Sequence, residues 1–191
     1  MRTPLIPCIL LVGSLAACTG QSTVKPVEAL DEQTGVTVGA LKNPIELVMS
    51  AQSATLSFGK RPNFAYLGPV EWNRSGVFSY SLWIHVSPGS ERPPGDIGAP
   101  GALTIILDDG PLVLSPSESP KLARDPYTPP VSWGQTAYFD LTTETLGRMA
   151  ASQKLELDVR AADGSTLSFA PTLDTRAALK EYLRDRGITG D

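Results

Sequence analysis

The chain has 191 residues, with 16 basic and 20 acidic side chains and a formal net charge of −4. That balance, without any run of Lys or Arg, excludes a basic surface for nucleic acid or anionic lipid. The length suits one domain with its own hydrophobic core, and no repeat of fixed period indicates a solenoid or a propeller.

The first residues have the pattern of an export signal. Arg2 precedes a largely apolar run over residues 5–12, and small residues follow up to Ala17. A charged start, a short apolar middle and small residues before a cleavage site are typical of a secretory signal peptide. A transmembrane helix is the alternative, but residues 5–17 fall short of the ~20 apolar residues that span a bilayer. We therefore expect residues 1–17 to be removed.

The segment Leu15-Ala16-Ala17-Cys18 resembles the lipobox of bacterial lipoprotein precursors. The resemblance implies that Cys18 becomes the new N-terminus and carries acyl chains such as palmitate. Two or three chains hold a protein stably on a bilayer, at about 0.8 kcal/mol per buried methylene. Simple secretion would instead leave Cys18 as an exposed, reactive thiol. Because Thr19 follows Cys18 where Asp commonly marks inner-membrane retention, the resemblance further implies the periplasm-facing leaflet of the outer membrane.

The mature chain divides into a tether and one domain. Residues 18–33 are polar and lack apolar periodicity, so they are expected to form a flexible tether behind the lipidated cysteine. Residues 34–191 are expected to form a single β-rich globular domain. Cys8 leaves with the signal and Cys18 takes lipid, so the domain contains no disulfide.

Alternation of apolar and polar residues predicts several strands. Over residues 77–86, one face carries Phe78, Tyr80, Leu82, Ile84 and Val86, and the other carries Ser79, Ser81, Trp83 and His85. This pattern predicts a strand with a core face and a mixed face, and residues 154–161 alternate in the same way. A sheet with one wet face is antiparallel. Weaker strand patterns cover residues 35–41, 45–49, 54–58, 64–72 and 133–141.

Turn residues connect some of these strands into hairpins. Asp163-Gly164 joins residues 154–161 to 165–170 and predicts a tight two-residue turn. Asp108-Asp109-Gly110 joins residues 102–107 to 111–114, where Pro111 indicates a strand start or an edge. Residues 87–100 and 115–130 are rich in Pro, Gly and Ser and are expected to form surface loops.

Two segments have helical spacing. Residues 143–152 predict a short helix capped by Thr142 or Thr143, and residues 172–186 predict a second helix that Gly187 ends. The expected fold is mainly β: an antiparallel β-sandwich or a strongly curved sheet, with one or two packed helices, one of them C-terminal.

Few residues of the sequence have the pattern of a catalytic site. His85 is the only histidine and no Gly-x-Ser-x-Gly motif accompanies it, so we favour a structural role. One histidine without a free cysteine excludes zinc, and we expect neither metal nor cofactor. Asp108 and Asp109 fit a turn better than a calcium loop. A pair of carboxylates could still hydrolyse a glycan, with candidates Glu91, Asp96, Asp108, Asp109, Glu118 and Asp125.

Aromatic residues provide the one positive indication of binding. The candidate binding surface comprises Trp72, Trp83, His85, Tyr127 and Trp133, against the alternative that the tryptophans fill the core. The leading hypothesis is a non-catalytic accessory lipoprotein that binds a protein or an envelope polymer. The alternatives are a carboxylate-based enzyme acting on a glycan such as peptidoglycan, and a small-ligand carrier with a cavity lined by Phe78, Tyr80 and Leu82.

Overall fold

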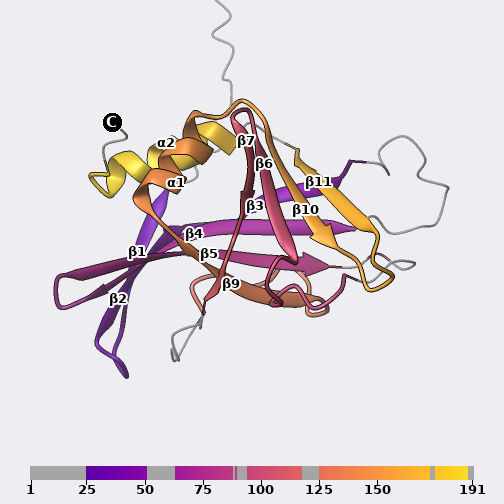
Figure 1. The fold of residues 1–191 in the computed structure, drawn as a ribbon. Coiled ribbons are helices and arrows are strands. Elements are labelled where there is room, and N and C mark those ends of the chain that lie inside the picture. Colours follow the sequence, from indigo (N-terminus) through magenta and orange to yellow (C-terminus); the bar gives the residue numbers. More distant parts are fainter. Residues whose placement is uncertain are drawn as a thin grey trace, which may run out of the picture.

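A computed structural model describes residues 25–50, 63–87, 89, 94–117, 125–172 and 175–188. Within these ranges the chain forms one curled antiparallel sheet, shaped like half a barrel, with two helices packed beside it (Figure 1). The expectation of a mainly β fold with a curved sheet and a C-terminal helix is therefore confirmed. The leader, Cys18 and the expected strand over residues 54–58 lie outside the described residues.

Most described elements are strands; one helix precedes the final two strands, and the other follows them. The strands are β1 (Pro26–Asp31), β2 (Val36–Leu41), β3 (Ile45–Met49), β4 (Phe64–Arg74), β5 (Val77–Ser87), β6 (Leu103–Leu107), β7 (Gly110–Val113), β8 (Pro116–Ser117), β9 (Gln135–Leu141), β10 (Leu155–Arg160) and β11 (Thr166–Pro171), and the helices are α1 (Thr143–Ala151) and α2 (Thr175–Asp185). Only β1 and β8 fall where the sequence predicts no strand.

Strand β4 organises the sheet because it changes partners along its length. Its first residues pair with β3, as in Ile45 with Leu67, and its later residues pair with β2, as in Ala40 with Val70. Its other edge pairs throughout with β5, which in turn pairs with β9. Beyond β3 the sheet continues through β11, β10, β6 and β7. The sheet therefore branches at β4, and β1 and β2 form an arm beside its main path (Figure 1).

The expected tether is wrong over Pro26–Asp31, because these residues form strand β1. They pair with β2 from Pro26 opposite Leu41 to Asp31 opposite Val36. Most of the β1 side chains are exposed. The strand therefore depends on main-chain hydrogen bonds to β2 rather than on burial, and a strand of this kind has no apolar alternation to reveal it.

Strand β5 departs from the expected division into a core face and a mixed face. Leu82, Ile84 and Val86 are buried as expected, but Trp83 and His85 on the opposite face are also buried. Phe78, expected in the core, is 53% exposed near the β4–β5 turn. The second half of β5 is thus covered on both faces, whereas its first half extends past the body of the domain.

The start of α1 and the end of α2 have the local chemistry that the sequence indicates. The Thr142 side chain accepts a hydrogen bond from the Thr145 N–H and caps α1. At the end of α2, the Ile188 N–H donates to the Leu183 carbonyl and the Gly187 N–H donates to the Arg184 carbonyl. Gly187 has a φ of +63°, which completes a Schellman motif. The buried faces, Leu146 and Met149 in α1 with Leu179, Tyr182 and Leu183 in α2, join the sheet core.

The hairpin predicted at Asp163-Gly164 is present, but its loop is one residue longer than expected. The Ala161 N–H donates to the Ser165 carbonyl, so three residues lie between this pair. Gly164 has a φ of +81°, and the Asp163 carboxylate accepts from the Ser165 N–H. The other predicted hairpin pairs Leu107 with Gly110, and β7 with Pro111 lies at the sheet edge as predicted.

Candidate functional site

The five residues of the candidate aromatic surface do not share one exposed face. Trp83, Tyr127, His85 and Trp72 are between 0% and 5% exposed, whereas Trp133 is 48% exposed. An exposed binding surface is therefore wrong for four of the five residues, and the alternative of interior tryptophans holds for Trp72 and Trp83. Residues 125–134 cover Trp83 and His85, because Tyr127 lies against Trp83 and Gly134 lies against His85, and alternation within one strand cannot reveal such a cover.

Tyr127 fastens this covering segment to the sheet. Its ring lies against Trp83, with 5.0 Å between ring centroids, and over Gly68, where an added Cβ would overlap the ring. Its hydroxyl accepts a hydrogen bond from the Leu41 N–H (3.0 Å) and donates to the Pro69 carbonyl (2.8 Å). The hydroxyl therefore bridges β2 and β4 immediately beyond their last pair. Burial raises the pKa of Tyr127, so the hydroxyl stays protonated.

His85 belongs to the same buried layer. Its ring stacks near Trp83, with centroids 6.0 Å apart, and its Nδ1 lies 2.8 Å from Thr136 Oγ1. Burial lowers the pKa of His85 and outweighs the main chain of Trp133, which acts in the opposite direction. The imidazole is thus enclosed and neutral near pH 7, in agreement with a structural role.

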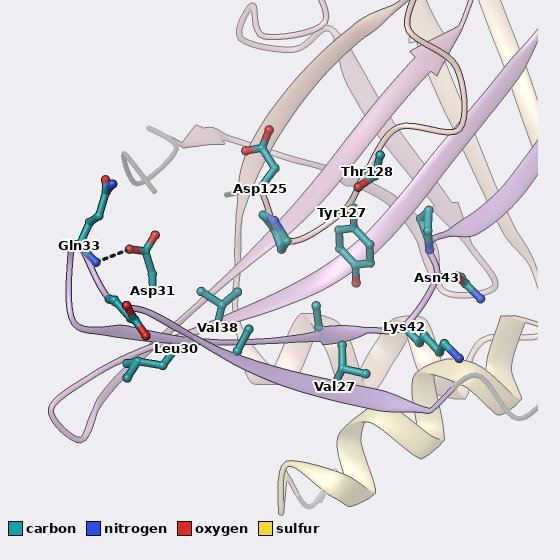
Figure 2. A pocket seen from close by; sticks show the side chains of 15 residues that line it. Val27, Leu30, Asp31, Gln33, Val38, Lys42, Asn43, Asp125, Tyr127 and Thr128 are labelled. Carbon is teal, nitrogen blue, oxygen red and sulfur yellow. Dashed lines mark hydrogen bonds between the residues drawn. The ribbon is translucent and has the colours of Figure 1, made fainter. Parts of the chain in front are cut away.

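A groove of about 700 Å³ lies between the β1–β2 arm and residues 125–128. Figure 2 shows Asp31 and Gln33 at one end of this groove, Lys42 and Asn43 at the other, and Tyr127 between them. Val38 and Ala40 of β2 supply buried apolar surface to it. Sequence reasoning missed the groove because its two walls are some 80 residues apart in the chain.

The polar residues of the groove carry more negative than positive charge. Asp31, Glu32 and Asp125 line it together with one base, Lys42. The Asp31 carboxylate also accepts hydrogen bonds from the N–H groups of Gln33 (3.0 Å) and Thr34 (3.2 Å), which hold the turn of the arm. The groove thus combines an apolar middle with an acidic end.

A buried arginine ties the C-terminal helix to the arm. Arg186 contacts the Glu28 carboxylate, lies 3.5 Å from Glu71, and donates to the Val27 carbonyl at 3.3 Å. The Arg186 and Glu71 side chains are 5% and 7% exposed, and Gly39 leaves room for the guanidinium. Burial acts to lower the pKa of Arg186, but the two carboxylates raise it by more, so the group stays charged.

Most of the described carboxylates proposed for glycan hydrolysis are held by local hydrogen bonds or ion pairs. Asp108 accepts from the main-chain N–H groups of Gln153 and Lys154, which lower its pKa. Asp109 pairs with Arg148 at 2.8 Å. Asp96 accepts from Gly98 in a loop, and Asp125 lies at the groove. Glu91 and Glu118 lie outside the described residues.

The cavity expected for a small-ligand carrier is not formed by the three residues named for it. Leu82 is fully buried in the core and Tyr80 is half-buried, whereas Phe78 is exposed near the β4–β5 turn. These side chains therefore do not line one common cavity.

Comparisons with known proteins add no assignment. No family model, curated protein or solved structure matches the chain. Among the described residues, no helix has the length and apolarity to cross a membrane. The same part of the chain contains no cluster of three or more His, Cys, Asp or Glu residues placed to bind a metal ion.

Proposed function

We propose that the chain is a lipid-anchored module of the bacterial outer membrane that binds a protein or an envelope polymer in the groove beside β1 and β2. The observation that carries the proposal is the groove itself, with its apolar middle between Val38, Ala40 and Tyr127 and its carboxylates at one end. Its volume falls within the range of about 300–1,000 Å³ that is common for small-ligand pockets, so it can take a few side chains or part of a polymer. Apolar surface with a few fixed polar groups favours recognition.

The position of β1 supports a site close to the membrane. The strand begins at Pro26, so eight residue steps separate it from the proposed lipid on Cys18. At about 3.5 Å per residue, these steps reach at most about 28 Å in any conformation. A partner in or near the membrane surface is therefore within reach of the groove.

Site-specific photo-cross-linking in living cells tests the proposal. A photoreactive residue replaces Leu30 of β1, which is 62% exposed beside the groove, or Val113 of β7, which is 64% exposed on another edge strand. We expect a discrete adduct from position 30 and none from position 113. Equal labelling at both positions, or no adduct at position 30, would contradict a binding role for the groove.

The anchor is tested by Cys18→Ser in the full-length precursor. We expect metabolic labelling with a fatty acid to be lost and the protein to leave the membrane fraction. Continued membrane association of Cys18→Ser would show that another part of the chain holds it there, and the lipid anchor would be wrong.

A further inference from the structure

Resting on the proposed function, we propose that the groove recognises an extended protein segment, which adds to the sheet as a new strand along the free edge of β1. The segment alternates apolar and basic side chains, and a basic residue lies at the Asp31 and Asp125 end. Main-chain hydrogen bonds to an edge strand supply affinity in this mode of binding, and alternate side chains supply specificity.

The direction of the main-chain groups identifies the free edge. The Lys42 N–H donates to the Lys25 carbonyl at 2.9 Å, so the main chain of Lys25 faces β2. Because this direction alternates from residue to residue along a strand, Val27 and Ala29 also turn their N–H and C=O groups toward β2. Leu41, which lies opposite Pro26, follows the same alternation, because its N–H points away from β1 and donates to the Tyr127 hydroxyl. Glu28 and Leu30 therefore turn their N–H and C=O groups outward, and among the described strands only β2 pairs with β1.

Strand β1 lacks three features that commonly block an edge, although Glu28 places one charge on it. Proteins protect edges with Lys, with Pro inside the strand, or with very short strands. The four-residue β7 has such protection in Pro111, whereas the six-residue β1 has Pro26 only at its first position and no Lys. Val27 and Leu30 are 42% and 62% exposed beside this edge.

The negative charge of the groove lining favours a basic segment as the occupant. Carboxylates outnumber bases three to one in the groove lining, so basic side chains on the added strand gain favourable contacts. A second copy of this chain fits less well, because β1–β1 pairing would bring together the Glu28, Asp31 and Glu32 carboxylates of both copies. The strand must also be narrow enough for its side chains to enter between β2 and Tyr127.

Peptide binding to the full chain tests the inference. The probe is a fluorescein-labelled ten-residue peptide that alternates Val and Lys, and binding is followed by fluorescence anisotropy. One control replaces Lys with Glu, and a second carries N-methyl groups on alternate amides, which removes donors but keeps charge and apolarity. We expect the Lys peptide to bind at least about tenfold more tightly than either control, a difference of about 1.4 kcal/mol. Equal binding of the N-methylated or the Glu peptide would overturn the proposal.

Variants of β1 provide a second test. Leu30→Pro removes an outward N–H, whereas Leu30→Ala shortens the side chain and keeps that donor. We expect Leu30→Pro to lose binding of the Lys peptide and Leu30→Ala to keep most of it, with circular dichroism checking the fold of both. Should Leu30→Pro unfold, Asp125→Asn with Glu32→Gln tests the charge, because binding of the Lys peptide should weaken. Unchanged binding in the folded Leu30→Pro or in the charge variant would refute strand addition.

The two proposals fail in different ways. An adduct at position 30 with a glycan, in a protein that does not bind the Lys peptide, would retain the binding module and reject strand addition. Absence of any adduct at position 30 would reject the binding module itself.

Discussion

Replacing Tyr127 with Phe isolates the hydroxyl that bridges β2 and β4. The ring remains against Trp83, but the Leu41 N–H loses its acceptor and the Pro69 carbonyl loses its donor. A buried donor without a partner costs about 1–3 kcal/mol, and a carbonyl tolerates the loss better because it has a second lone pair. We expect the free energy of unfolding to fall by about 2 kcal/mol. For a chain of this size, that change lowers Tm by about 4–8 °C.

Urea unfolding followed by tryptophan fluorescence measures the change. The denaturant dependence should keep its slope, because the surface exposed on unfolding is the same, and only the midpoint should shift. Tyr66→Phe is the matched control, since Tyr66 lies on the same sheet face and its hydroxyl has no hydrogen-bond partner among the described residues. A Tyr127→Phe protein within about 0.5 kcal/mol of the wild type, the range of ordinary surface changes, would refute the bridging role.

Three further predictions concern buried groups. Gly68→Ala should destabilise the fold by about 1–3 kcal/mol in urea, because its Cβ overlaps the Tyr127 ring, and an unchanged midpoint would contradict that contact. Arg186→Met should lower the free energy of unfolding by about 3 kcal/mol, because Glu71 stays buried without a counter-charge. Adding Glu71→Gln should recover part of the loss, and simple additivity of the two changes would argue against the ion pair. Because burial holds the folded-state pKa of His85 below 6.5, the unfolded chain binds the proton more readily, and stability should fall as pH drops through 6.5. Urea midpoints at about pH 7.5 and about pH 5.5 should show a smaller fall in His85→Gln, and an equal fall would contradict the assignment.

Local signals in the sequence were sufficient for much of the fold. The Thr142 cap, the Gly187 stop and the Asp163-Gly164 turn each depend on residues a few positions apart, so they could be read directly. Alternation likewise located most strands. Burial of Trp83 and His85 could not be read in the same way, because Trp83 lies against Tyr127 and His85 lies against Gly134, each more than 40 residues away in the chain.

The candidate site was beyond the reach of sequence patterns for a related reason. Strand β1 is held by main-chain groups that are the same for every residue type except proline, so its polar sequence resembles a linker. The groove then arises only when this unrecognised strand, with β2, meets residues 125–128. Of the five residues predicted for the aromatic surface, only Tyr127 lines the groove, and Trp83 lies against its ring.

The contact of Arg186 with Val27 and Glu28 has a mechanical consequence. If the chain is anchored through Cys18 as proposed, tension from the membrane would enter β1 at its start, and the pairs of β1 with β2 would separate one at a time. The hydrogen bond between Lys25 and Lys42 would part first and the pairs of Pro26 and Val27 would follow, and Arg186 contacts the chain at this point from the end of α2. Tension would thus pass early into α2, so that this C-terminal helix restrains β1 against being drawn away.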